Sequence, residues 1–216
     1  MNYEKKYGAP FPVIGVTLNE NESICIEPGT MVYSDPTIAL QTLTNAERQK
    51  RTGGKRVGMF SRANKLLTVV WGTHQSRAAV APCVPGDIIE LSCDDNLGQQ
   101  WNIIAGAFLA CDMAINFEVM QSSWTGLFSG GIPICILQTS GTGSCIVDSC
   151  GNLHKINLNG NKTINVDVNH LVAWSAGLQY QTFQQRGAAW TAFTAQFSGH
   201  GSIILQSNCR TTPAAK

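Results

Sequence analysis

The sequence has few charged residues and no strong excess of either sign. Asp, Glu, Lys and Arg make up 13% of its 216 residues, and the formal net charge at pH 7 is +1. A chain so close to neutral exerts no global attraction on nucleic acid or acidic lipid, so nucleic acid is not an expected partner. Its hydrophobic content of 44% favours association between copies of the chain, and we therefore expect a homo-oligomer with further, unknown protein partners.

Segments that direct a protein to or across a membrane are also missing. No stretch approaches the ~18 consecutive apolar residues of a membrane-spanning helix. The N-terminal stretch MNYEKKYGAPFPVIGV has neither the apolar core of a signal peptide nor the Arg-rich, acid-poor character of a transit peptide. The expected location is the cytoplasm, where the eight cysteines would be reduced and mostly buried.

Motifs for metal binding and catalysis are sparse. The cysteines contain no C-x-x-C pair, which argues against zinc knuckles and thioredoxin-type chemistry. The histidines contain no His-x-His pair, so a cupin-like metal-dependent enzyme using some of His154, His170 and His200 is a weak alternative. Gly-x-Gly occurs at 141 and 199, but between strands, where no helix N-terminus would bind phosphate. The sequence therefore predicts no catalytic residue, no metal ligand and no cofactor, and we expect a non-enzymatic protein.

What the sequence does contain is a β pattern, clearest between residues 141 and 174. Apolar residues alternate with polar ones through Ile156 and Leu158, and again through Ile164, Val166 and Val168. Alternation with a period of two, interrupted by Gly and Asn, is typical of strands and turns. The Asn-Gly pair at 159–160 suits a two-residue turn, and it predicts a hairpin between these two runs.

The same pattern recurs along the chain. The apolar positions from Val16 to Val32 match those from Ile156 to Val172 at a constant separation of 140 residues. A third version lies between them, with Leu91 as the predicted counterpart of Leu18 and Leu158. We therefore predict three repeats of about 70 residues, at about 59–115, 126–180, and 190–207 combined with 13–40. Joining the two ends of the chain predicts one compact β domain, 1–216, closed with pseudo-three-fold symmetry, in which sheet edges are covered.

One segment departs from the β pattern. Thr44 and Glu47 have the spacing of a helix capping box, which predicts a short helical insertion near 44–52. The insertion opens a basic cluster, a candidate patch for anions or acidic lipid, formed by Arg48, Lys50, Arg51, Lys55 and Arg56. The simpler interpretation of the cluster is a solvated, partly mobile loop, and no aromatic residue interleaves it as a single-strand nucleic-acid site would need.

Several short motifs, in their order and spacing, carry a family resemblance. They are Glu27-Pro-Gly-Thr-Met-Val32, Ala81-Pro82 with Pro85-Gly-Asp-Ile88, Gly126-Leu-Phe128, Gly143-Ser-Cys-Ile-Val147, His170-Leu-Val-Ala173 and Gly199-His-Gly-Ser-Ile-Ile-Leu-Gln206. Over residues 13–207 the chain resembles the altered inheritance of mitochondria protein twenty-four family. The resemblance implies a fold related to the trp RNA-binding attenuation protein, a short double-stranded β-helix. A mitochondrial relative is implicated in inner-membrane organisation, and the family supplies no catalytic motif.

Three functions follow as expectations. The first is an all-β, self-associating scaffold or interaction module, with a link to membrane organisation implied by the resemblance. The second is a peripheral binder of anionic membranes or polyanions through residues 48–56. The third, and weakest, is the cupin-like metal-dependent enzyme.

Overall fold

The computed structural model describes residues 2–44, 66–72, 75–120, 135–185 and 192–209. Most of these residues are in antiparallel strands, and no α-helix occurs among them. The fold is therefore all-β, as the alternating pattern predicted. The helical insertion expected near 44–52 begins at the last residue of a strand, and the rest of it lies outside the described residues.

The strands fall into three consecutive sets of six, preceded by β1 (Asn2–Lys5). Unit 1 contains β2 (Ile14–Leu18), β3 (Ser23–Ile26), β4 (Met31–Ser34), β5 (Ile38–Thr44), β6 (Leu66–Gly72) and β7 (Ser76–Val80). Unit 2 contains β8 (Ile88–Cys93), β9 (Trp101–Ile104), β10 (Phe108–Asp112), β11 (Asn116–Met120), β12 (Ile136–Ser140) and β13 (Gly143–Asp148). Unit 3 contains β14 (Leu153–Asn159), β15 (Ile164–Asp167), β16 (Leu171–Ser175), β17 (Gln179–Gln185), β18 (Ala192–Ser198) and β19 (His200–Gln206). Short 3-10 turns are η1 (Asp95–Leu97), η2 (Ala105–Ala107) and η4 (Val168–His170).

Strand pairing follows the same scheme in each unit. The first and third strands both pair with the last strand, while the second and fourth both pair with the fifth. Each unit thus contributes half of one sheet and half of the next. The four sheets have the orders β1-β2-β7-β4, β5-β6-β3-β10-β13-β8, β11-β12-β9-β16-β19-β14 and β15-β18-β17, and we call them the first to fourth sheets.

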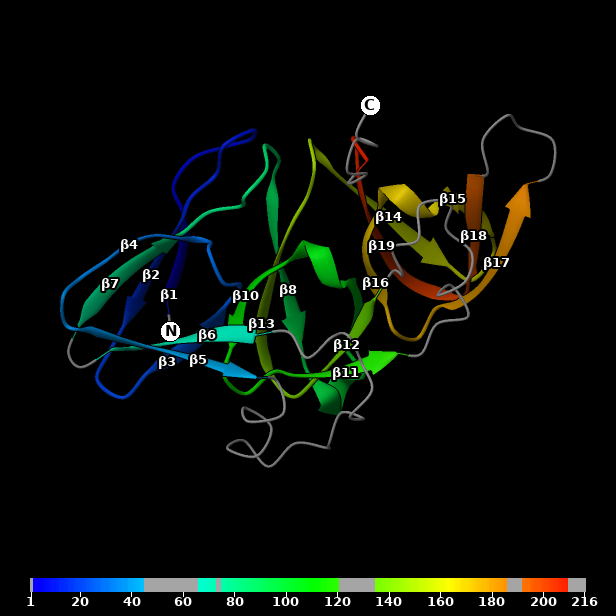
Figure 1. Cartoon of the computed structure of the whole chain (residues 1–216). Coiled ribbons are helices and arrows are strands. Elements are labelled where there is room, and N and C mark those ends of the chain that lie inside the picture. The colour runs from blue at the N-terminus through cyan, green and yellow to red at the C-terminus, as the bar shows by residue number, and fades with distance from the viewer. Residues whose placement is uncertain (1, 45–65, 73–74, 121–134, 186–191, 210–216) are drawn as a thin grey trace.

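Three clusters of buried apolar side chains lie between these sheets, whose strands are labelled in Figure 1. The unit 1 core includes Ile24 and lies between the first and second sheets. The unit 2 core includes Ile103 and Phe117 and lies between the second and third sheets. The unit 3 core includes Trp174 and Phe197 and lies between the third and fourth sheets. Alternation of side chains between the two faces lets the second and third sheets serve two cores each.

A β-bulge marks the same place in the third strand of every unit. The register shifts between Met31 and Tyr33 in β4, between Phe108 and Ala110 in β10, and between Leu171 and Ala173 in β16. In each unit, the residue two positions after this shift accepts a hydrogen bond through its side-chain oxygen. The donor is a backbone N–H of the last strand of the same unit. These bonds are Arg77 to Asp35, Ser144 to Asp112 and Ser202 to Ser175. Register, bulge and side-chain acceptor define which residues of the three units are equivalent.

The predicted closure of the molecule is wrong. The strands within residues 13–40 pair with β1, with β6 and β7 of unit 1 and with β10 of unit 2, and residues 192–206 pair within unit 3, so no repeat combines 190–207 with 13–40. The units are consecutive, and the strands of units 1 and 3 lie at opposite ends of the molecule (Figure 1). The physical reason is that the last strand of each unit pairs with the first and third strands of the same unit. The N-terminal and C-terminal segments therefore find their strand partners without pairing with each other.

Two smaller predictions also fail. The Asn159-Gly160 turn does not form a hairpin, because β14 pairs with β19 and β15 pairs with β18 in a different sheet. The Gly160 N–H instead donates to the Gly199 carbonyl, 2.9 Å away, at the corner between the two sheets. Leu91 is not the counterpart of Leu18 and Leu158, since the pairing register places Cys93 at that position.

Candidate self-association edges

The basic cluster predicted as an anion or lipid patch lies outside the described residues. Arg48, Lys50, Arg51, Lys55 and Arg56 all fall between 45 and 65, so the patch stays a prediction. Within the ranges that the structure describes, no helix has the length and apolar character to cross a membrane.

The three candidate histidines do not form one cluster. His154 and His200 are exposed and lie near opposite ends of the β14–β19 pair, opposite Leu205 and Asn159. His170 ends η4 and is half-buried. Across the described part of the chain, no group of three or more His, Cys, Asp or Glu side chains could hold a metal ion. The structure therefore brings together no ligand set for the cupin-like alternative.

His170 does contact a thiol that no sequence motif singles out. Its Nδ1 lies 2.7 Å from the Gln206 carbonyl oxygen, and its Nε2 lies 3.2 Å from Cys209 Sγ. A carbonyl only accepts, so Nδ1 carries the proton and Nε2 accepts from the thiol. Burial raises the pKa of the Cys209 thiol, with nearby Asp167 and Cys150 adding to the rise. A raised pKa favours the protonated thiol, whereas cysteine nucleophiles that are present as thiolates have a lowered pKa.

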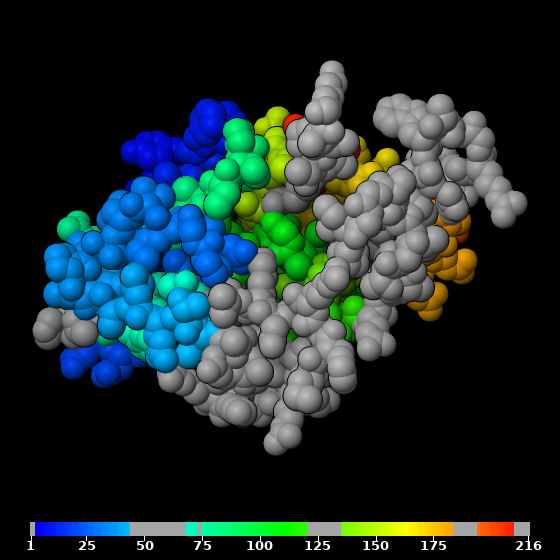
Figure 2. All heavy atoms as spheres, in the orientation of Figure 1, coloured from blue at the N-terminus to red at the C-terminus, as the bar shows by residue number. Residues whose placement is uncertain are grey.

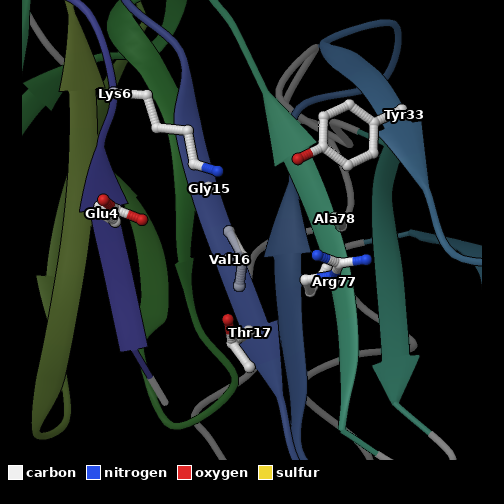
Figure 3. A pocket seen from close by; sticks show the side chains of 8 residues that line it. All are labelled: Glu4, Lys6, Gly15, Val16, Thr17, Tyr33, Arg77 and Ala78. Carbon is white, nitrogen blue, oxygen red and sulfur yellow. The ribbon is translucent and has the colours of Figure 1, made fainter.

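A polar hollow of about 260 Å³ opens on the outer face of the first sheet (Figure 3). Its charged side chains are Glu4, Lys6 and Arg77, from or next to β1 and from β7. Arg77 Nε lies 3.6 Å from Asp35 Oδ2, so part of its charge is already compensated. The Lys6 stem lies over Gly15, where an added Cβ would come within 2.7 Å of Cε. The hollow is thus lined by side chains of both charges, and among its lining residues no nucleophile lies beside a general base.

The outer edge of the first sheet exposes apolar side chains. Strand β4 ends this sheet, and Val32 and Tyr33 on it are 57% and 47% exposed. Their equivalents in units 2 and 3 are buried: Leu109 is 1%, Val172 0%, Ala110 0% and Ala173 0% exposed. Exposed apolar residues on an edge strand are the feature that soluble proteins usually avoid. The β4 edge is therefore a candidate contact surface.

The outer edge of the fourth sheet is the second candidate. Strand β15 ends this sheet, and its Asn165 is exposed. The Gln196 Nε2 on β18 donates a hydrogen bond to Asn165 Oδ1 at 3.0 Å. The exposed face of β15 is therefore polar at this position. The unit 2 equivalent, Asn102, is only 4% exposed because β16 covers that edge. The sequence repeat relates Val32 to Val172, but it does not predict that Val172 is buried while Val32 is exposed.

Comparisons with known proteins agree over nearly the whole chain. The family model described as Mitochondrial biogenesis AIM24 matches residues 3–208. An uncharacterized protein of Streptococcus pyogenes serotype M6 is 31% identical over 209 residues, covering 91% of this chain and 82% of the relative. The X-ray crystal structure of a Streptococcus pyogenes protein is similar with a TM-score of 0.76 and 24% identity, covering 96% of this chain and 94% of that one. The family resemblance seen in the sequence motifs is thus confirmed, and the chain belongs to the Mitochondrial biogenesis AIM24 family.

Proposed function

We propose that this protein is a non-enzymatic scaffold that assembles with copies of itself. In this proposal the three units are copies of one module related to the trp RNA-binding attenuation protein. The observation that carries the proposal is the exposure of Val32 and Tyr33 on β4, at positions whose equivalents in units 2 and 3 are buried. Burial of an exposed valine and tyrosine stabilises association by about 25 cal/mol for each Å² of apolar surface removed from water.

Three further observations support a binding role over catalysis. Burial raises the pKa of the Cys209 thiol, which contacts His170, whereas a cysteine nucleophile present as a thiolate has a lowered pKa. The polar hollow contains three charged side chains of mixed sign in an open setting. The low overall charge, 13% of residues, reduces repulsion between identical copies.

The proposal is tested by the mass of the protein in solution. Light scattering after size-exclusion chromatography should show species larger than 23.3 kDa that dissociate on dilution. Val32→Lys should weaken association, because it places a charge in the surface to be buried. Val84→Lys is the matched control, since Val84 is also an exposed valine, at 38%, but lies in the connection between β7 and β8. A wild-type protein that is a strict monomer at every concentration would exclude the proposal.

A further inference from the structure

Two junctions inside the chain show how one unit joins the next. At the first junction, β10 of unit 2 pairs with β3 of unit 1, with Cys111 opposite Cys25. At the second junction, β16 of unit 3 pairs with β9 of unit 2, with Trp174 opposite Asn102. The third strand of the later unit meets the second strand of the earlier unit in both cases, in the same antiparallel register.

Among the described residues, the two remaining strands of these types have no such neighbour. The third strand of unit 1, β4, ends the first sheet, and the second strand of unit 3, β15, ends the fourth sheet. The two strands lie on opposite sides of the molecule in Figure 1, and Figure 2 shows unit 1 in blue to cyan at one end and the strands of unit 3 next to β15 in orange at the other. One copy therefore cannot join them, but two copies can.

Building on the proposed scaffold function, we propose that the protein assembles head to tail, with β4 of one copy pairing with β15 of the next. The joined sheet would have the order β17-β18-β15-β4-β7-β2, followed by β1. This is the order of the third sheet, β11-β12-β9-β16-β19-β14, strand for strand. The contact between copies thus repeats a contact that the chain already makes twice within itself.

The internal junctions also fix the register between copies. Ala110 lies opposite Ile26 and Ala173 lies opposite Ile103. The equivalent residues at the intermolecular contact are Tyr33 and Val166, which places Ser34 opposite Asn165. The bulge in β4 is no obstacle, because β10 and β16 carry the same bulge and pair on both sides.

The backbone groups of β4 point in the direction that this register needs. The Asp35 N–H donates inward to the Arg77 carbonyl at 2.8 Å. Successive residues of a strand direct their backbone groups to opposite sides, so the Ser34 N–H and carbonyl face outward. At the first junction the Glu27 N–H donates to the Leu109 carbonyl at 2.9 Å. The equivalent bond between copies runs from the Asp167 N–H to the Val32 carbonyl.

Side-chain burial at the junctions explains why Val32 is exposed in a single copy. Leu109, its equivalent in unit 2, packs into the unit 1 core, and Val172, its equivalent in unit 3, packs into the unit 2 core. Each of these residues enters the core of the preceding unit. Val32 would enter the unit 3 core of the preceding copy. Because the two contacting surfaces differ, the assembly grows as a ring or a filament and does not stop at a symmetric dimer.

Two proline variants test the pairing one edge at a time. Ser34→Pro removes the outward N–H of β4, and Asn165→Pro removes the corresponding N–H of β15. Each variant should associate with itself at least roughly tenfold more weakly than wild type. An equimolar mixture should form a dimer and nothing larger, because each partner retains one intact edge. The matched control is Lys5→Pro, whose N–H also faces outward but on β1, at the other edge of the first sheet; it should assemble like wild type.

The mass of each sample distinguishes the outcomes. Dimer formation in the mixture shows that both variants fold and supports head-to-tail pairing. A symmetric β4–β4 contact would leave Asn165→Pro self-associating and the mixture without a mixed dimer, which overturns this inference but leaves the scaffold proposal intact. Head-to-tail pairing is likewise overturned, and self-association retained, if both edge variants assemble like wild type. A wild-type monomer at every concentration would overturn both.

Discussion

At the scale of single residues, a tyrosine hydroxyl ties the N-terminal strand to the second sheet. Tyr3 on β1 donates a hydrogen bond to Asp112 Oδ1 on β10 at 2.8 Å. The other oxygen of Asp112 accepts the Ser144 N–H, so one carboxylate joins three strands of two sheets. Burial raises the pKa of Tyr3 well above its ordinary value, and the negative charge of Asp112 raises it further. The contact therefore favours the protonated phenol.

Replacing this phenol tests its contribution to stability. Tyr3→Phe should lower the free energy of unfolding by about 1.5–3 kcal/mol, the range for a hydrogen bond to a charged group. Because the pKa is raised on folding, the stabilisation is complete below the unfolded pKa of ~10 and is lost as the pH rises above it. Urea unfolding between neutral and alkaline pH should show a shallower alkaline decline for Tyr3→Phe than for wild type. Tyr7→Phe, at a residue 68% exposed, is the control; equal stability of Tyr3→Phe and wild type would contradict the prediction.

At the scale of elements, the connection between units 1 and 2 packs tightly against the connection between units 2 and 3. Gly86, between β7 and β8, forms a parallel bridge with Gly151, between β13 and β14. The Gly86 N–H donates to the Pro10 carbonyl at 2.8 Å. A Cβ added at Gly86 would lie 1.6 Å from the Ser149 carbonyl oxygen. Backbone atoms would have to move to accept it, so this glycine is required by the close approach of two connections.

A glycine-to-alanine pair measures that requirement. Gly86→Ala should destabilise the protein by about 1–3 kcal/mol or more, the usual cost of forcing extra atoms into a packed region. Gly177→Ala should cost little, because a Cβ there meets nothing within 4 Å. Urea unfolding monitored by circular dichroism gives both values. If the two variants are equally stable, the connections are looser than the structure shows.

The sequence predicted strands well and strand partners poorly. Alternation through Ile24 and Ile26, and again through Ile164 and Val166, identifies local β structure because side-chain direction has a period of two. The Asn159-Gly160 turn shows the limit, since local turn chemistry suits a hairpin and the two flanking strands nevertheless belong to different sheets. Partner choice depends on contacts between distant residues, which the alternation does not encode.

The candidate site was predictable only in part, for a similar reason. The separation of 140 residues aligned Val32 with Val172, and their strands do hold equivalent positions around the bulge. Which of the two is covered depends on whether another unit precedes it, and the sequence alone led to a closed molecule in which both would be covered. The contact between His170 and Cys209 had no signal either, because it needs the Gln206 carbonyl to orient the ring.

At the scale of the whole molecule, three cores are coupled through shared sheets. The second sheet covers the unit 1 core on one face and the unit 2 core on the other, and the third sheet does the same for units 2 and 3. Loss of either shared sheet exposes two apolar layers at once. The units should therefore unfold together, even though each is complete in its own strand pairing.

Two core substitutions at opposite ends test this coupling. Ile24 and Ile203 are both 0% exposed, in the unit 1 and unit 3 cores respectively. Ile24→Ala and Ile203→Ala should each cost about 2–5 kcal/mol, through lost burial and the cavity left behind. Hydrogen exchange in urea, below the assembly concentration, should show β3 and β16 losing protection in one transition in either variant. If Ile24→Ala lowers the protection of β3 while β16 keeps its wild-type midpoint, the units are independent and the shared sheets do not couple them. Coupling of this kind would also carry the effect of an intermolecular contact at β4 into units 2 and 3, since the first sheet, which β4 ends, and the shared second sheet enclose the unit 1 core.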